Sequence, residues 1–296
     1  NDWCGTISQS FDDVELHEIP PNGQGIAALM ALGSLQHTAI RDHGPDDLAA
    51  AHLQIEAVKL AYSDLHAYVG DRTHMGDVDE TALLDPAYLK SRAALINPDR
   101  AQDFGAGAPK QGGTVLMNIG DASGMMVSFI QSNYAGFGSG VVVPGTGISM
   151  QNRGLGFTTE QGHPNQVAPG KRPFHTIIPG FAMKNGAPHM AFGMMGGPIQ
   201  AMGHVQLLLR TQLWDQDPQT AADAPRWRTI EGLDVACEPT MSFDVLDGLR
   251  ALGHNIQIEA PDNAFGFGGA QLVQRLEGGG YAAGSDPRKD GQAAGY

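Results

Sequence analysis

The chain has 296 residues, 42% hydrophobic and 17% charged, so it is long and apolar enough to bury a substantial core, and disorder is a poor interpretation. Its 18 Lys and Arg against 32 Asp and Glu give a net charge of −14, without any basic run. This pattern argues against phosphate-backbone binding, so we expect neither nucleic acid nor a membrane surface as a partner.

Helical patterns fill the first third of the chain. Residues 25–40 are apolar on nearly all sides, as expected of a buried helix. From Leu48 to Val69 apolar residues recur at three- and four-residue steps, and Gly70 is a plausible end for that helix. Asp85-Pro86 begins a third helix, which Asn97-Pro98 ends.

A connector rich in Gly, Ala and Pro spans 103–113, and we expect it to be an exposed, flexible loop. Strand patterns follow it, at 114–120, 124–131, 140–143, 147–151, 174–178, 181–184 and 189–192. Residues 122–152 carry no charge, but glycines interrupt them throughout, which indicates buried strands and tight turns rather than a membrane span.

The remainder of the chain mixes helix and strand. We expect helices at 198–214 and 243–252, and a hairpin of 268–276 with 280–283. Runs of strands flanked by runs of helices predict an α/β chain built as α+β layers of helix on sheet.

Several motifs are absent from the sequence. There is no P-loop, no GxGxxG after a strand, no HExxH and no GxSxG. The two cysteines, Cys4 and Cys237, are too few for a disulfide framework, and the 11 histidines show no ligand spacing. We therefore expect neither a metal nor another cofactor.

Several segments in order resemble the γ-glutamyltranspeptidase family of N-terminal-nucleophile hydrolases, including its cephalosporin-acylase-like branch. They are PPNGQGI at 20–26, Gly113-Thr114, IQSNYAGFGSG at 130–140, PGKRP at 169–173, GMMGG at 193–197 and GSDPR at 284–288. The resemblance implies a four-layer αββα sandwich. Residues 1–113 would then be the C-terminal part of the large subunit and 114–296 the small catalytic subunit, together one domain that lacks the front of the large subunit.

The family chemistry implied for Gly113 and Thr114 is also physically reasonable. Cleavage between these residues would give Thr114 a free α-amine, whose pKa near 8 suits a general base at neutral pH. That amine could take the proton of the Thr114 hydroxyl, which is otherwise a weak nucleophile. A threonine at a strand start, without any such role, is the alternative.

Further catalytic residues follow from the resemblance. Ser132 corresponds to a second hydroxyl that would orient the Thr114 hydroxyl, or else it is a turn serine. Gly196 and Gly197 correspond to the oxyanion-hole glycines, whose N–H groups would stabilise a developing oxyanion before a helix; a plain strand-to-helix turn has the same pattern. We expect the 171–173 and 285–288 clusters to be structural supports.

The substrate-binding positions depart from the family pattern. The residues corresponding to the set that holds the glutamate α-amine and α-carboxylate are Tyr134, Arg153, Gly156, His175 and Thr176. Gly156 offers no carboxylate to an ammonium, whereas Arg153 could pair with a carboxylate in bidentate fashion or simply form a surface ion pair. This combination suits a glutaryl-type acyl group at least as well as a γ-glutamyl group.

The leading hypothesis is a γ-glutamyltransferase or glutathione hydrolase that forms an acyl-enzyme on Thr114. A glutaryl-type cephalosporin acylase with the same mechanism is the alternative, and an unprocessed, non-catalytic binding homologue is the second. The partners would be a small γ-glutamyl or related acyl amide and the absent large-subunit portion. The compartment stays open, with a soluble periplasmic or secreted bacterial protein as one expectation, and so does homo-oligomerisation.

Overall fold

The computed structural model of the chain describes residues 3–105, 113–259 and 266–296. The central part of the predicted connector, 106–112, lies outside the described residues, so the expectation of a flexible loop there stays a prediction. Gly113 and Thr114 begin the first strand after it.

Three sheets carry the strands. The largest has the order β1-β2-β5-β6-β10-β11, with all neighbours antiparallel. A second sheet is the antiparallel pair β3-β4, and the third is β7-β8-β9. The strands are β1 (Ile7–Phe11), β2 (Val14–Glu18), β3 (Gly113–Gly120), β4 (Met126–Tyr134), β5 (Gly180–Lys184), β6 (Ala187–Met195), β7 (Trp227–Glu231), β8 (Asp234–Cys237), β9 (Asn255–Ile258), β10 (Gly269–Arg275) and β11 (Tyr281–Ser285).

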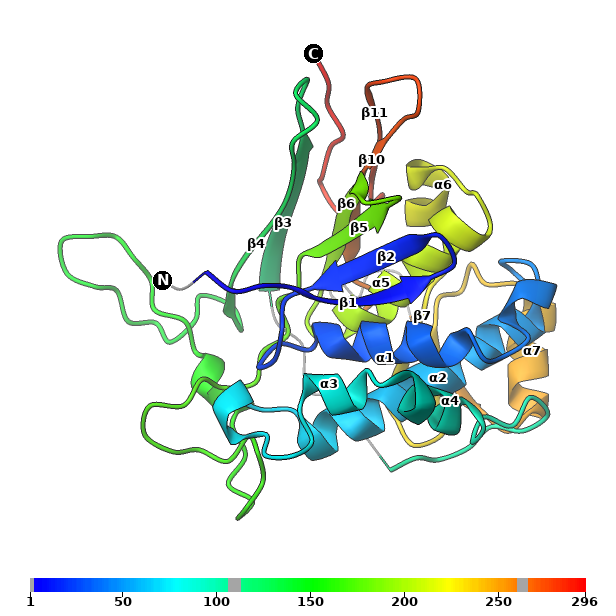
Figure 1. The fold of residues 1–296 in the computed structure, drawn as a ribbon, viewed down its shortest axis with the longest axis horizontal. Helices are drawn as coiled ribbons and strands as arrows, with labels where there is room; N and C mark the ends of the chain where they lie inside the picture. The colour runs from blue at the N-terminus through cyan, green and yellow to red at the C-terminus, as the bar shows by residue number, and fades with distance from the viewer. Residues whose placement is uncertain (1–2, 106–112, 260–265) are drawn as a thin grey trace.

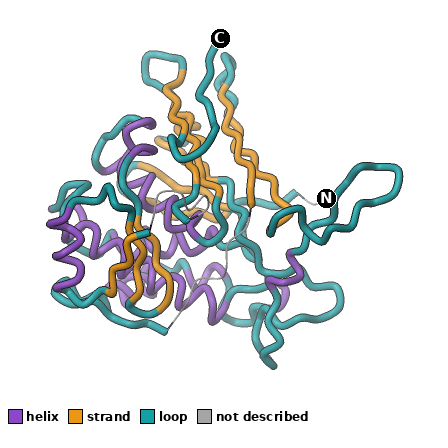
Figure 2. The backbone as a smooth tube through the Cα atoms, turned by 180° about the vertical axis from the view of Figure 1, so that it is seen from behind, coloured by secondary structure: helices purple, strands orange, loops and turns teal. Residues whose placement is uncertain are grey.

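The helices gather on one side of the large sheet (Figures 1 and 2). They are α1 (Gly25–Leu35), α2 (Leu48–Tyr68), α3 (Glu80–Leu83), α4 (Pro86–Ala93), α5 (Ile199–Leu208), α6 (Pro218–Asp223) and α7 (Phe243–Ala251), with 3₁₀ turns at Ile40–Asp42, Arg72–His74 and Arg153–Gly156. The apolar helix α1 is buried along its whole length, because β1, α2 and α5 cover different sides of it. One π-helical turn, η4 (Leu209–Leu213), continues α5.

Most predicted elements are confirmed, although several are wrong or were missed. Residues 140–143 and 147–151 are not strands and share only an isolated bridge, and 174–178 is extended but pairs with Gly23 alone. Glycines with positive φ, such as Gly140, Gly145 and Gly147, break up the 135–152 segment. The prediction missed the β1-β2 hairpin and the sheet β7-β8-β9, whose strands are only four or five residues long.

The hairpin β3-β4 packs on the face of the large sheet opposite to α5. In β6, Phe192 and Met194 contact His204 and Gly203 of α5, whereas Leu116 of β3 lies against the intervening Gly193, which the His204 ring also approaches. Successive strand residues point to opposite faces, so helix and hairpin lie on opposite sides of β6. Asn118 Nδ2 donates to the Gln271 carbonyl (2.7 Å) and fixes the hairpin on β10.

The outer face of β3-β4 is apolar and exposed, which contradicts the expectation that residues 122–152 are buried. Its side chains are Val115, Met117, Ile119, Val127 and Phe129, each more than 40% exposed. The described residues therefore provide a helical layer, the large sheet and part of a second sheet, and none of them covers the hairpin from outside (Figure 1). The α+β class is confirmed, and no helix among the described residues is long and apolar enough to cross a membrane.

A buried polar network joins α2 to the segment between α7 and β9. His52 and His254 share a hydrogen bond of 2.8 Å, and the other ring nitrogen of His52 lies 2.8 Å from the Asn97 carbonyl oxygen. Glu56, one helical turn after His52, accepts a hydrogen bond from Lys59 (2.8 Å). The prediction of histidines without ligand spacing overlooked this group, because His254 joins it only through the fold.

Only one group of three His, Cys, Asp or Glu side chains in the described part of the chain is close enough to share a metal ion. It consists of His52, Glu56 and His254, whose ligand atoms lie within 4.8 Å of one another. Lys59 already neutralises Glu56, and the two imidazoles bond each other. Protein groups thus balance the charges of the network, and we assign it a structural role.

This network predicts a loss of stability in mild acid. Burial, with Lys59 and His52 nearby, lowers the pKa of His254 to about 3. Below pH 6.5, His254 is therefore protonated in the unfolded chain but stays neutral in the folded chain. The free energy of unfolding then falls by about 1.4 kcal/mol per pH unit, down to the pKa of the folded state. Urea unfolding of wild type and His254→Phe between pH 7 and 4 should show a shallower pH slope for the variant; equal slopes would contradict the assignment.

Candidate active site

A β-bulge sets the position of Thr114 at the start of β3. The ladder pairs Gly113 with Tyr134 and Val115 with Gln131, so Thr114 lies opposite both Ser132 and Asn133. Bulges of this kind re-aim a side chain and are frequent beside active sites. The register thus brings the two predicted hydroxyl residues, Thr114 and Ser132, across from one another on neighbouring strands.

Ser132 also organises the turn that follows β4. Its Oγ accepts a hydrogen bond from the Tyr134 N–H (2.9 Å), and its carbonyl accepts one from Arg153 Nη2 (3.4 Å). Tyr134 has a left-handed backbone conformation with φ of 77°, and the Arg153 guanidinium lies 5.6 Å from the centre of its ring. Ser132 therefore lies within β4, and both of its predicted roles, orienting Thr114 or serving only the local backbone, stay predictions.

A cavity of about 220 Å³ opens beside this turn. Its walls include all four predicted substrate-binding residues, Tyr134, Arg153, His175 and Thr176, although they come from separate parts of the chain. The end of α2 and the loop around Asn165 supply the opposite wall, which the sequence did not indicate. None of the described lining residues is an aspartate or a glutamate.

Arg153 supplies a buried positive charge to this cavity. Only 8% of the residue is exposed, and burial lowers the pKa of its guanidinium. No carboxylate among the described residues forms an ion pair with it, and its Nη1 makes no hydrogen bond. Since a buried charge without an oppositely charged partner is costly, the site is suited to an anion supplied by a ligand. The alternative of a surface ion pair is wrong.

Gly156 is constrained by a close backbone contact. A Cβ at this position would lie 2.4 Å from the Phe174 carbonyl oxygen, closer than real Cβ atoms approach. Asn165 holds the two segments at this spacing, donating from Nδ2 to the Gly156 carbonyl (2.6 Å) and accepting from the Phe174 N–H (3.0 Å). The backbone arrangement therefore leaves no room for any side chain, including a carboxylate, at position 156.

His175 enters the cavity from an extended segment that pairs with the chain before α1. The His175 N–H donates to the Asn22 carbonyl and its carbonyl accepts from the Gln24 N–H, both at 3.1 Å. Burial, together with the charge of Arg153, lowers the pKa of the imidazole to about 4. The ring is therefore neutral near pH 7 and adds no second positive charge beside Arg153.

Gly196 and Gly197 form the turn between β6 and α5. Their φ angles are 129° and 71°, in the region that favours glycine. The turn leads directly into α5, whose N-terminal N–H groups carry the positive end of the helix dipole. Plain turn geometry and an anion-stabilising role are both compatible with this arrangement, as the sequence indicated.

Gln24 connects this glycine turn to the substrate cavity, and the sequence analysis missed it. Its side chain is fully buried, and its Nε2 donates to the carbonyls of both Thr176 (2.8 Å) and Gly197 (2.9 Å). The Tyr62 hydroxyl of α2 donates to the Pro198 carbonyl and lies 3.4 Å from Gln24 Oε1. The signal was present in the PPNGQGI segment, where a glutamine stands between two glycines.

The remaining polar clusters are structural, as expected. Asp286 is buried between Arg226 (2.5 Å) and Arg288 (3.2 Å), and Arg288 also binds Glu238 (2.6 Å). Lys171 donates to the Pro164 carbonyl at the edge of the cavity wall. These contacts hold β10, β11 and the cavity loop in place.

Comparison with known proteins agrees with this geometry. The model of one protein family, gamma-glutamyltranspeptidase, matches residues 1–296. The oxamate amidohydrolase proenzyme of Klebsiella pneumoniae is 36% identical over 299 residues, which cover 99% of this chain and 55% of that protein. The glutathione hydrolase-like YwrD proenzyme of Bacillus subtilis is 31% identical, covering 99% and 56%.

A solved structure is also similar. The crystal structure of cephalosporin acylase from Bacillus halodurans superimposes with a TM-score of 0.92 at 42% identity, covering all of this chain and 53% of that one. The chain therefore spans about half the length of the relatives it matches.

The two hydrogen bonds donated by Gln24 Nε2 predict that removing this side chain strongly destabilises the folded protein. Gln24→Ala leaves the Thr176 and Gly197 carbonyls buried without donors, and each such group costs about 1–3 kcal/mol. Denaturant unfolding should therefore show a loss of roughly 2–6 kcal/mol. Gln36→Ala is the matched control, because Gln36 also donates to a backbone carbonyl, that of Ser10, but at the exposed surface. Equal small losses in both variants would contradict the structural role of Gln24.

Proposed function

Because the chain belongs to the gamma-glutamyltranspeptidase family, whose members are hydrolases, we propose that the whole protein is an amidohydrolase cut between Gly113 and Thr114. Its preferred substrates are amides whose acyl group ends in a carboxylate and carries no α-ammonium. The observation that carries this proposal is the buried guanidinium of Arg153, which no described carboxylate neutralises.

Thr114 is the proposed nucleophile. Once the preceding peptide bond is cut, its free α-amine takes the hydroxyl proton while Oγ attacks the substrate carbonyl. The proton passes to the departing amine as the C–N bond breaks, which leaves an ester on Thr114. Water then attacks this ester, with the α-amine again as base, and releases the carboxylic acid and the threonine hydroxyl.

Two neighbouring features support this chemistry. Ser132 lies across the bulge from Thr114, where a second hydroxyl can orient the nucleophile. Gly196 and Gly197 provide backbone N–H groups at a helix start, suited to the negative charge on the tetrahedral intermediate. Gln24 would hold this turn at a fixed distance from the cavity.

The similar proteins favour the same class of substrate. The Klebsiella relative is named for oxamate, a small amide whose other end is a carboxylate, and another similar protein is a cephalosporin acylase. In the cavity, Arg153 would bind the carboxylate with two N–H groups, while neutral His175 and the ring of Tyr134 complete the walls.

A γ-glutamyl donor is the second candidate, favoured by the glutathione hydrolase-like relative. Its α-carboxylate could also bind Arg153, but its ammonium would find no acidic side chain among the described lining residues. An unprocessed binding homologue is the third; it requires that Gly113-Thr114 stay uncut.

We also infer that the rest of the protein covers the outer face of β3-β4. That face exposes five large apolar side chains, and the relatives are nearly twice as long as this chain. The N-terminal part of the large subunit, packed on this face, would complete the second sheet and add the second helical layer of the αββα sandwich.

The nucleophile is tested by the intact mass of the full-length protein. Wild type should yield two fragments, the smaller beginning at Thr114, whereas Thr114→Ala should remain one chain because no hydroxyl can attack. Thr146→Ala, which changes a threonine in an exposed turn, should be cut like wild type. A folded wild-type protein that stays uncut would overturn the proposal and favour the binding homologue.

Substrate selection is tested on Arg153→Gln in the processed protein. With oxamate or glutaryl-4-nitroanilide, kcat/KM should fall ten- to a hundredfold, equivalent to the roughly 1.5–3 kcal/mol of a charged hydrogen bond. Butyryl-4-nitroanilide, which lacks the carboxylate, should change little. Arg250→Gln, at an exposed ion pair, is the control. A γ-glutamyl donor that outperforms the glutaryl one in wild type would favour the second candidate.

A further inference from the structure

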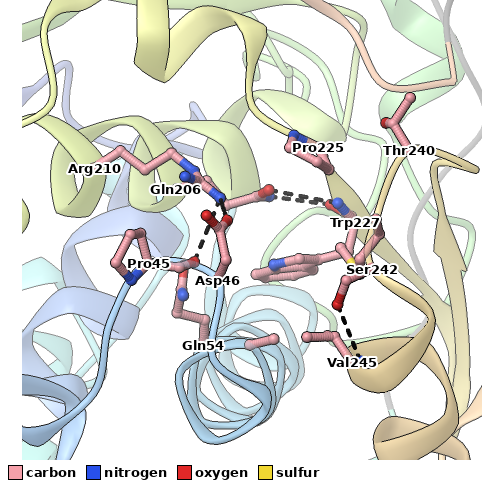
Figure 3. A pocket seen from close by; sticks show the side chains of 12 residues that line it. Pro45, Asp46, Gln54, Gln206, Arg210, Pro225, Trp227, Thr240, Ser242 and Val245 are labelled. Carbon is pink, nitrogen blue, oxygen red and sulfur yellow. Dashed lines mark hydrogen bonds and ion pairs between the residues drawn. The ribbon is translucent and has the colours of Figure 1, made fainter.

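Figure 3 shows a second cavity, of about 260 Å³. It shares no lining residue with the acyl-amide site. Its walls come from the loop before α2, from α2, α5, η4 and β7, and from the segment entering α7. Gln54 of this cavity and Leu65 of the other are 11 residues apart on one helix, or roughly 16 Å along its axis. Nothing in the proposed hydrolysis uses this second cavity.

Its floor is apolar and rigid. Trp227 is 3% exposed, and the Gln206 side chain holds its backbone at two points, donating to its carbonyl (3.0 Å) and accepting from its N–H (3.5 Å). Figure 3 shows the indole ring reaching into the cavity between Gln206 and Gln54. Ala51 and Val245 complete this floor, and such surfaces bind aliphatic or aromatic groups.

One rim of the cavity carries a positive and a negative side chain side by side. Arg210 Nη2 lies 2.7 Å from Asp46 Oδ1, and Gln216 Oε1 accepts from Arg210 Nη1 (3.1 Å) and steadies the guanidinium. The Arg210 side chain is only 11% exposed, whereas that of Asp46 is 68% exposed. Water screens this pair from the Asp46 side, so a charged ligand can compete with Asp46 for the Arg210 guanidinium.

Arg210 also lies in the π-helical turn η4, which widens the helix where its side chain meets the cavity. Single π-turns of this kind are frequent at functional sites. The turn gives an independent reason to look for a ligand here.

We propose that this cavity binds a free α-amino acid with an apolar or aromatic side chain. The ligand carboxylate pairs with Arg210, its ammonium pairs with Asp46, and its side chain packs on Trp227. A ligand with one charge would satisfy one member of the rim pair and repel the other. A zwitterion satisfies both, and the modest volume restricts the ligand to a small molecule.

The test is calorimetric titration of the full-length protein with L-phenylalanine, 3-phenylpropanoate and phenethylamine, which share the ring but differ in charge. Phenylalanine should bind one site, and the two singly charged analogues should bind at least tenfold more weakly. Ala51→Leu fills the cavity and should lower phenylalanine affinity at least tenfold. Ala94→Leu, on an exposed helix end, is the matched control and should bind like wild type.

Asp46→Asn keeps the proposal testable if Ala51→Leu does not fold, because Asp46 is exposed. It should weaken phenylalanine binding at least tenfold and strengthen that of 3-phenylpropanoate, since Arg210 then lacks a competing carboxylate. Absence of phenylalanine binding to the full-length protein, equal binding of all three ligands, or binding that neither variant changes would overturn the proposal. Because the cavity is apart from Thr114, these outcomes do not depend on hydrolysis.

Discussion

The two hydrogen bonds that Gln24 Nε2 donates, to Thr176 and to Gly197, are the constraint on which the site depends. They join a cavity segment and a glycine turn that lie about twenty residues apart in the chain, and they originate from the residue just before α1. Because Gln24 is fully buried, these two carbonyls receive their hydrogen bonds from a protein side chain away from bulk water. The distance between the place where an acyl group would lie and the N–H groups that would stabilise its oxyanion is thus fixed from the core.

The electrostatics of the cavity follow from burial rather than from charge pairing. Arg153 is enclosed without a described carboxylate, and neutral His175 leaves it as the dominant charge. Enclosure makes that charge effective, since a guanidinium in a low-dielectric wall attracts an anion more strongly than one in water. The same enclosure makes the site selective, because an ammonium group would meet the same positive potential.

Local sequence patterns predicted the long elements, and the family resemblance supplied the candidate site residues, but neither predicted the residues that support the site. Helix α2 and strands β3 and β4 have enough residues for a period to be read, whereas the short strands β7 to β9 do not. Arg153 and His175 were found through their place in family motifs. Gln24 and the partnership of His52 with His254 depend on contacts between distant segments, which no local pattern records.

The contact between Gly156 and the Phe174 carbonyl has a consequence for how substrate preference can evolve in such a chain. Introducing an acidic side chain at position 156 requires the neighbouring backbone to move first, and Asn165 ties that backbone down on both sides. A new side chain at position 156 would therefore disturb this wall of the cavity unless the Phe174 segment changed with it. The cavity can gain a side chain here only through coupled changes, not through one substitution.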